Sequence, residues 1–246
     1  MPSFGPIAGH YDLLMANVPY DMWAGYYRLL LAQIEAKPHE LLDVCCGTGT
    51  LAEMMTRSGF DVEGFDLSPE MIEIAKRKAE EHNLSIKYTV ADATTVNLGR
   101  QFDGAYSFFD SLNYITSAEG LRQAIHRVSE HLRPGGSFIF DLNTSYAFEQ
   151  NMFDQEDLRK RALIRYKWSG KYDKDTRIIE VDMTFWRNEE TIVERHVQRA
   201  HRDEEVREFL EEAGFINVRA FDSYTLDPPR KRSDRLHYTA IRNPSD

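Results

Sequence analysis

The stretch of sequence that decides the fold is LLDVCCGTGT, residues 41–50. A short β-rich run leads into two glycines and a helical pattern follows, which is the order of the first strand, turn and helix of a parallel α/β sheet. Gly47 and Gly49 allow the backbone to come close to a ligand, and the N-terminus of the following helix supplies free N–H groups. We therefore expect a polar ligand above this turn.

Similar units continue on the C-terminal side of this turn. The sequence predicts further strands at 61–65, 86–90, 104–109 and 137–142, with helices after Ser68 and over 118–131. After Asn143, alternating runs separated by turn residues predict an antiparallel meander at 163–172, 176–186 and 191–201. The chain closes with a helix over 204–213 and strands at 217–222 and 237–242. We predict an α/β core formed by 1–143 and 203–246, with an antiparallel β insert at 144–202.

The composition is that of an ordinary globular protein. With 246 residues, 42% of them hydrophobic and 28% charged, the chain suits one domain with an insertion or two small domains. Disordered, collagen-like and disulfide-scaffold proteins are excluded by the same values. The formal net charge of -10 repels polyphosphate, so we expect no nucleic-acid partner.

The two cysteines, Cys45 and Cys46, are adjacent, so they neither close a useful disulfide loop nor match the spacing of a zinc site. Residues 1–9 lack the regions of a targeting signal, and no stretch has the ~18 apolar residues of a membrane span. We expect a soluble cytoplasmic protein, monomeric or homodimeric, with no metal site and no membrane partner.

Acidic residues are predicted along one edge of the sheet. Asp43 precedes the glycine turn, Asp66 follows Gly47 by 19 positions, and Asp92 follows the third strand. Open α/β sheets bind ligands along this edge, where a carboxylate such as Asp66 can accept both hydroxyls of a ribose. The glycine motif alone also fits NAD. Acids at both the ribose and the ammonium ends, and the lack of a Tyr-x-x-x-Lys pair, favour S-adenosylmethionine (SAM).

Five motifs occur in the order used by class I SAM-dependent methyltransferases, at residues 43–49, 65–71, 91–93, 102–103 and 132–136. The chain resembles this family, which implies a seven-stranded Rossmann-like sheet of order 3-2-1-4-5-7-6 with the insert as a lid. More narrowly, it is similar to an uncharacterised prokaryotic small-molecule group related to glycine N-methyltransferase and the aminosugar N,N-dimethyltransferases, through residues 10–12, 18–21, 110–114 and 196–200.

The resemblance implies a role for each matching residue. The methionyl part of SAM would lie at Gly47 and Gly49, its ammonium near Asp43 and its ribose on Asp66. The adenine would contact Leu67, Met71, Asp92 and Ala93. The other cofactor-binding residues would be Thr48, Phe109 and Cys45, where the family usually has glycine.

Three aromatic residues of the N-terminal segment, Tyr11, Tyr20 and Trp23, are also expected at the cofactor. In the related enzymes this segment folds over the amino-acid end of SAM, and a sulfonium cation is attracted to aromatic faces. The alternative is a helix that simply buries residues at 3–4 spacing, namely Trp23, Tyr26, Tyr27 and Leu30.

The candidate catalytic residues are Tyr114, Tyr11, His196 and Arg199. Tyr114 matches the position of a histidine in the aminosugar dimethyltransferases and could orient an acceptor, or it could be a partly buried aromatic at the sheet edge. His196 and Arg199 alternate to opposite faces of a strand, so at most one enters a given pocket. Arg199 interrupts an apolar face formed by Val193 and Val197, which predicts a buried anionic partner.

The meander has polar positions at Glu180, Asp182 and Thr184 on one strand and at Glu194, His196 and Gln198 on the next. The apolar face of the first of these strands carries Ile179, Val181, Met183 and Phe185. Polar faces of antiparallel sheets most commonly meet solvent, and this is the expectation for the acids.

The sequence thus predicts in-line transfer of the sulfonium methyl of SAM to a nitrogen or oxygen atom of a small acceptor molecule. Since SAM is already activated, orienting the acceptor in a dry pocket is the main requirement. Two alternatives stay open: an NAD-dependent oxidoreductase, and a SAM-binding or RNA-modification accessory module without catalysis.

Overall fold

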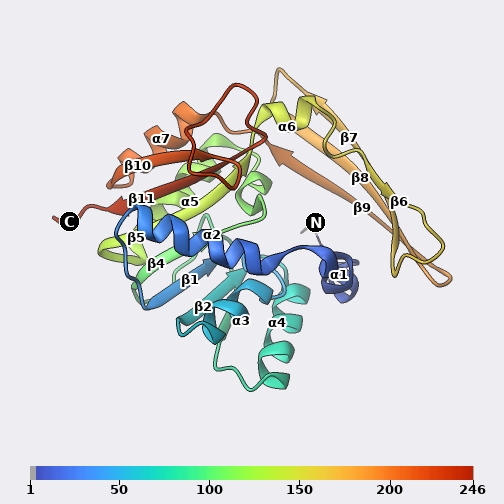
Figure 1. Cartoon of the computed structure of the whole chain (residues 1–246), viewed down its shortest axis with the longest axis horizontal. Helices are drawn as coiled ribbons and strands as arrows, with labels where there is room; N and C mark the ends of the chain where they lie inside the picture. The colour runs from blue at the N-terminus through green and yellow to red at the C-terminus, as the bar shows by residue number, and fades with distance from the viewer. Residues whose placement is uncertain (1–3, 246) are drawn as a thin grey trace.

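Two β-sheets organise the chain in the computed structural model, which describes residues 4–245 (Figure 1). Residues 1–3, part of the stretch in which the sequence predicts no targeting signal, lie outside the described residues. Within 4–245, no helix combines the length and the apolar character needed to cross a membrane.

The larger sheet has the strand order β10-β11-β5-β4-β1-β2-β3. Its strands are β1 (Glu40–Val44), β2 (Asp61–Asp66), β3 (Lys87–Val90), β4 (Phe102–Ser107), β5 (Leu132–Asn143), β10 (Phe215–Asp222) and β11 (Arg235–Arg242). Strands β1 to β5 pair in parallel, and β11 is antiparallel to both β5 and β10. Numbered within this sheet alone, the order is 3-2-1-4-5-7-6, so the predicted fold is confirmed.

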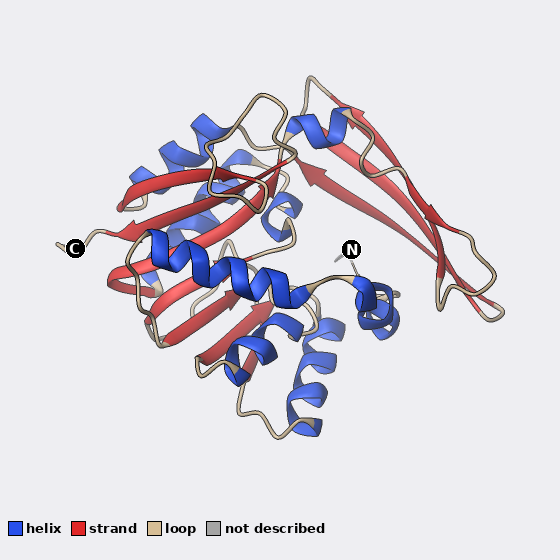
Figure 2. Cartoon of the chain, in the orientation of Figure 1, coloured by secondary structure: helices blue, strands red, loops and turns tan. Residues whose placement is uncertain are grey.

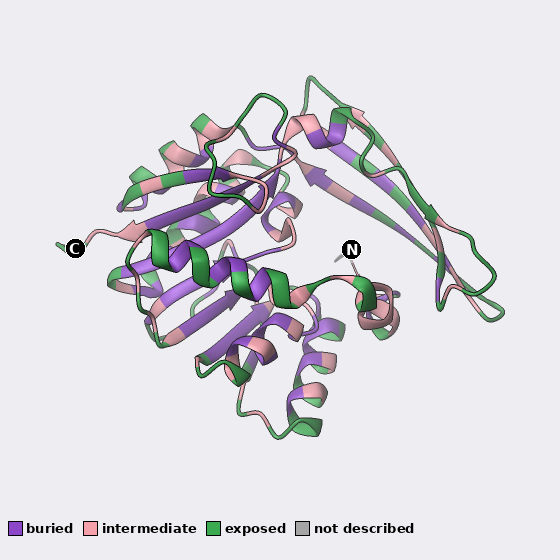
Figure 3. Cartoon of the chain, in the orientation of Figure 1, coloured by how far each residue is buried: buried purple, intermediate pink, exposed green. Residues whose placement is uncertain are grey.

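Helices cover both faces of this sheet (Figure 2). One face packs against α5 (Ala118–Glu130) and α7 (Asp203–Glu212), the other against α2 (Tyr20–Gln33), α3 (Thr50–Arg57) and α4 (Pro69–Glu81). Each helix turns its apolar side inward, and Figure 3 shows this burial. The start of α4 follows the predicted signal, because Ser68 Oγ accepts the N–H of Met71 at 3.2 Å and Pro69 opens the helix.

The second sheet lies between β5 and α7 along the chain and has the order β6-β7-β8-β9. It is antiparallel throughout and consists of β6 (Gln155–Asp157), β7 (Arg165–Asp173), β8 (Ile178–Arg187) and β9 (Glu190–Arg199). The predicted meander is therefore confirmed. The sequence did not predict α6 (Ser145–Glu149) or β6, because both are too short to show a periodic pattern.

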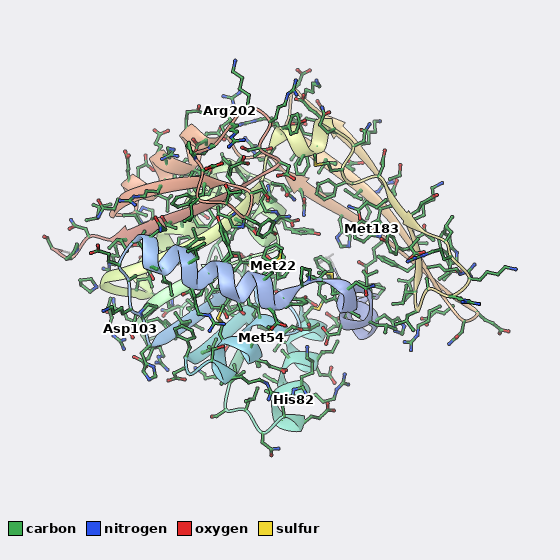
Figure 4. All side chains as sticks on the ribbon, in the orientation of Figure 1. Met22, Met54, His82, Asp103, Met183 and Arg202 are labelled. Carbon is green, nitrogen blue, oxygen red and sulfur yellow. The ribbon has the colours of Figure 1, made fainter. Side chains whose placement is uncertain are left out.

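One side of the second sheet is turned toward α1 (Ala8–Leu14), as Met183, labelled in Figure 4, illustrates. Ile7, Met183 and Phe185 share a buried apolar cluster there, with Leu13 of α1 packed against it. We call the sheet face turned to α1 the inner face. It lies beside the N-terminal segment, which the family resemblance implies to fold over the cofactor.

The expected division of the second sheet into polar and apolar faces is wrong for β9. Antiparallel pairing sets His196 opposite Val181 and Glu194 opposite Met183, so both polar side chains lie on the inner face and are buried. Val193 on the outer face is 66% exposed, which contradicts the expected buried apolar face around it. The expectation of solvent contact holds for the acids of β8, Glu180 and Asp182, which are exposed.

Candidate active site

The glycine turn between β1 and α3 has two positions with left-handed backbone, Gly47 at φ +54° and Gly49 at φ +74°. A Cβ on Gly49 would lie 2.3 Å from Tyr88 Oη, so packing against Tyr88 requires glycine there. A Cβ on Gly47 would meet nothing within 4 Å, so space is open on that side. Of the two glycines, Gly47 is the one that leaves room for a ligand.

Cys45 also has a left-handed backbone, at φ +62°, which ends β1 at Val44, before the predicted end of the run. This conformation favours glycine and explains why a family consensus would place one at this position. Burial, with Asp66 and Asp43 nearby, raises the pKa of the Cys45 thiol well above its usual value. The thiol is therefore protonated at neutral pH and is a poor nucleophile.

Asp66, at the end of β2, is bound to the glycine turn. Its Oδ2 accepts the N–H of Gly47 at 2.9 Å, and its Oδ1 accepts the N–H of Ser68 at 2.9 Å. Burial raises the pKa of Asp66, although these backbone donors oppose the shift. Each carboxylate oxygen keeps acceptor capacity for a ligand hydroxyl.

The other two acids differ in environment. Asp43 is buried, and its Oδ2 accepts the Tyr106 hydroxyl at 3.0 Å. Burial raises the pKa of Asp43 to about 8. Asp92 is exposed and its Oδ1 accepts both the N–H and the hydroxyl of Thr94 at 2.8 Å.

The residues expected around adenine are only partly available. Leu67 is 53% exposed, which is unusual for a leucine and leaves an apolar surface beside Asp66. Met71 and Ala93 are buried, at 2% and 6% exposure. Leu67 is thus the member of this group with a free apolar face.

The N-terminal segment is docked on the glycine turn through Asp12. The Asp12 carboxylate accepts the Thr48 hydroxyl at 2.5 Å and lies 2.6 Å from Nζ of Lys78. Lys78 also donates to Oγ1 of Thr50 at 2.8 Å. Asp12 belongs to the motif at residues 10–12, whereas no sequence signal indicated Lys78.

Of the three N-terminal aromatic residues, two, Tyr20 and Trp23, pack on Phe109. Burial, with Tyr20, Asp110 and Asp66 nearby, raises the pKa of Tyr11 well above its usual value, so Tyr11 is a neutral phenol. Trp23 is 7% exposed and stacks on Phe109 with 4.0 Å between ring centroids, and Tyr20 packs on Phe109 at 5.0 Å. Trp23 is therefore buried in a helix, as the alternative interpretation expected, and it also contacts Phe109, a candidate cofactor residue.

A buried charged network that the sequence did not predict supports the loop after β4. Asp141 accepts the N–H groups of Phe109 and Asp110, at 3.2 and 2.6 Å, and both of these residues have positive φ. Arg235 lies 3.0 Å from Asp141 and 2.9 Å from Asp110. Gln198 of β9 donates to Asp110 at 2.7 Å, which joins the network to the second sheet.

Two of the candidate catalytic residues are in contact. The Tyr114 hydroxyl, in η2 (Ser111–Tyr114), lies 2.8 Å from Nδ1 of His196. The ring of Phe4 lies between them and Tyr11, with its centroid 5.4, 4.5 and 5.5 Å from the rings of Tyr114, His196 and Tyr11. Burial raises the pKa of Tyr114 well above its usual value.

Arg199 is not part of this group. It lies on the outer face of β9 and its Nη1 donates at 3.5 Å to the carbonyl of Thr116. The sequence predicted a buried anionic partner for Arg199, but within residues 4–245 its side chain forms this bond to a backbone carbonyl and no ion pair. The candidate site therefore contains Tyr11, Tyr114 and His196.

Comparisons with known proteins agree with this geometry. A family model described as "Methyltransferase domain" matches residues 41–136. The chain is 32% identical over 245 residues to GWCH70_2453 of Geobacillus sp. (strain WCH70), named as a candidate methyltransferase, covering 97% of this chain and 99% of that one. Over 101 residues, 41% of each chain, it is 36% identical to a dTDP-3-amino-3,4,6-trideoxy-alpha-D-glucopyranose N,N-dimethyltransferase of Streptomyces venezuelae.

A crystal structure of an S-adenosylmethionine-dependent methyltransferase from Clostridium acetobutylicum ATCC 824 superposes with a TM-score of 0.85 at 25% identity. The superposition covers 98% of this chain and 100% of the other. The oxidoreductase alternative is not favoured by these similarities. The glycine turn, the strand order and the near full-length relative show that this chain belongs to the SAM-dependent methyltransferase family.

Proposed function

We propose that this chain catalyses transfer of the SAM methyl group to a nitrogen or oxygen atom of a small molecule. The observation that carries the proposal is the contact between Tyr114 and His196, at 2.8 Å. Tyr114 follows β4, the neighbour of β1 in the sheet, and His196 reaches it from the inner face of β9. Polar groups from the loop after β4 and from the second sheet thus meet.

The chain's own residues fit SAM. Open space at Gly47 would admit the methionyl part, with Thr48 and Gly49 completing the turn and Asp43 close to the ammonium. Asp66 would accept the ribose hydroxyls, and Leu67, Asp92 and Ala93 would border the adenine, with Met71 beneath them. Bound there, SAM supplies an activated methyl group, and Tyr11, Tyr20 and Phe109 would surround its sulfonium with aromatic faces.

The acceptor would lie between η2 and the second sheet. Tyr11 and Tyr114 are neutral phenols whose oxygens can accept a hydrogen bond from a small polar molecule, and so orient its lone pair toward the methyl carbon. The Streptomyces relative methylates an amino-sugar nitrogen according to its name, which supports a nitrogen acceptor.

We also propose residues 144–202 as an insert that acts as a lid over this acceptor position. At its base, Gln198 bonds Asp110 and His201 bonds the carbonyl of Ile115 at 2.9 Å. Farther along the insert, the N-terminal segment contacts it through the N–H of Ile7, which donates to Glu194 at 2.8 Å, and through Nδ1 of His10, which lies 2.6 Å from Nη1 of Arg187. The inner face of β9 could then close over a bound acceptor and exclude water.

Incubation with methyl-labelled SAM and a panel of small amines, alcohols and phenols tests the proposed activity. The proposal expects labelled product and S-adenosylhomocysteine (SAH) from at least one class. Binding of SAM without turnover on any panel, together with co-purification of a protein partner, would instead support the accessory-module alternative.

A further inference from the structure

A continuous hydrogen-bonded chain of three side chains ends at the proposed acceptor position. Glu194 Oε2 lies 2.6 Å from Nε2 of His196, and Nδ1 of His196 lies 2.8 Å from Oη of Tyr114. The side chains of Glu194 and His196 are 5% and 1% exposed. Glu194 was not among the candidates from the sequence, because only the strand register places it on the inner face.

The order of donors in this chain follows from Glu194. An ionised carboxylate only accepts hydrogen bonds, so Nε2 of His196 carries the proton that faces Glu194. Nδ1 of a neutral His196 is then unprotonated and accepts the Tyr114 O–H. The Tyr114 oxygen keeps a lone pair on its other side.

The surroundings isolate this chain from bulk water. The second oxygen of Glu194 accepts the N–H of Ile7 at 2.8 Å, and the ring of Phe4 lies edge-on to His196 at 4.5 Å. The other titratable groups that act on Tyr114 are Asp110 and Tyr11, and the amide of Gln198 lies nearby. A proton can therefore reach His196 through Tyr114 more readily than from solvent.

Resting on the proposed function, we propose that Tyr114, His196 and Glu194 form a proton relay that accepts the proton of the methyl acceptor. The heteroatom's lone pair forms the new bond to the methyl carbon, while the electron pair of the carbon–sulfur bond stays on sulfur. The proton released by the heteroatom goes to Tyr114 Oη, and the Tyr114 proton passes to His196 Nδ1. Glu194 is a positioning residue that sets the tautomer of His196 and stabilises its imidazolium form.

This relay narrows the acceptor class. It is useful only if the attacking atom still carries a proton that has to leave, as in a hydroxyl group or a primary or secondary amine. A tertiary amine or a thioether, which has no such proton, would gain nothing from it. The structure thus assigns to this site neutral nitrogen or oxygen nucleophiles that carry a removable N–H or O–H proton.

Glu194→Gln tests the relay with little change of shape. The carboxamide oxygen can still accept the Ile7 N–H, but the amide NH2 donates to Nε2 of His196 and forces its proton onto Nδ1. Tyr114 can then no longer pass a proton to His196. Glu180→Gln is the matched control, because Glu180 is an exposed residue on β8 of the same sheet.

Nitrogen NMR of histidine-labelled protein in the presence of SAH reads the tautomer directly, with His196→Gln identifying the signal. We expect a proton on Nε2 in the wild type and the Glu180→Gln variant, and on Nδ1 in Glu194→Gln. With an amine or alcohol that reacts in the labelled-SAM panel, kcat/KM of Glu194→Gln should fall at least tenfold and lose the wild-type pH inflection, with unchanged SAH affinity.

A neutral wild-type His196 with its proton on Nδ1 would overturn the relay, even if Glu194→Gln does not fold. Normal activity and an unchanged pH profile in a folded Glu194→Gln variant would also overturn it. If no amine or alcohol of the panel is methylated, the result counts against the proposed function. The tautomer of His196 measured by NMR still decides whether the relay exists.

Discussion

The side-chain amide of Asn113 donates a hydrogen bond of 2.7 Å to the carbonyl of Arg199, 86 positions away in the sequence. The same amide also bonds the carbonyl of Asn143 at 3.1 Å, and its oxygen accepts the Asn143 N–H at 2.9 Å. Asn143 is the last residue of β5 before the second sheet, and Arg199 is the last residue of β9. One fully buried asparagine therefore holds both chain crossings between the two sheets.

Asn113→Ala should destabilise the fold by at least about 2 kcal/mol, since it leaves buried backbone groups without partners. Thermal and denaturant unfolding measure this loss. Asn97→Ala is the control, because Asn97 is exposed and accepts a single hydrogen bond, from the N–H of Gly99. Equal stability of the two variants would show that Asn113 does not hold the crossings.

Hydrogen exchange should slow in β7, β8 and β9 when SAH binds, because the second sheet packs on the N-terminal segment, which is docked on the glycine turn through Asp12. Exchange in α5, on the face of the main sheet away from α2 to α4, serves as the internal reference. If exchange between Arg165 and Arg199 is the same with and without SAH, and no acceptor changes it, the second sheet is not a lid.

SAH binding should release a proton at pH 7. The pKa of Asp43 is about 8 because of burial, so its carboxyl is mostly protonated in the free protein. The ligand ammonium favours the carboxylate, so binding lowers this pKa and expels the proton. Affinity should therefore rise as pH increases toward 8.

Calorimetry in buffers with different ionisation enthalpies measures the released proton, and Asp43→Asn is the control that has no such proton to lose. The same buffer dependence in the wild type and in Asp43→Asn would remove Asp43 from the ammonium site.

Tyr114→Phe should lower kcat/KM by tenfold or more, about 1.4 kcal/mol, with little change in SAM affinity, because it removes the hydroxyl that orients the acceptor. Tyr166→Phe, on β7, is a control for loss of a phenol elsewhere. The sequence alone predicts an equal loss of kcat/KM for Arg199→Ala. The position of Arg199 on the outer face of β9 predicts a smaller loss. Unchanged kinetics in Tyr114→Phe would move the acceptor position elsewhere.

Features encoded by neighbouring residues could be predicted from the sequence. The strand order was implied by the resemblance to class I methyltransferases, whereas the glycine turn, Asp66 and the succession of strands and helices follow from local patterns that recur along the chain. The N-cap at Ser68 is equally local. These predictions needed no knowledge of how distant strands pair.

Features set by pairing between distant segments could not be predicted. The faces of β9 depend on the register with β8, and a shift of one residue would exchange Glu194 and His196 with Val193 and Val197. Arg235 and Asp110 are 125 positions apart, so no local pattern announces their ion pair. The glycine turn and the acids beside it could therefore be predicted from the sequence, whereas the contacts between η2 and β9 were largely hidden.

The central claim is that SAM lies over the glycine turn with its ribose on Asp66. Titration calorimetry with SAH on the wild type, Asp66→Ala and Asp61→Ala tests it, since Asp61 is an exposed aspartate at the other end of β2. We predict micromolar binding by the wild type and Asp61→Ala, and binding weaker by about 1.5–3 kcal/mol in a folded Asp66→Ala. Equal SAH affinity in Asp66→Ala and the wild type would contradict the account.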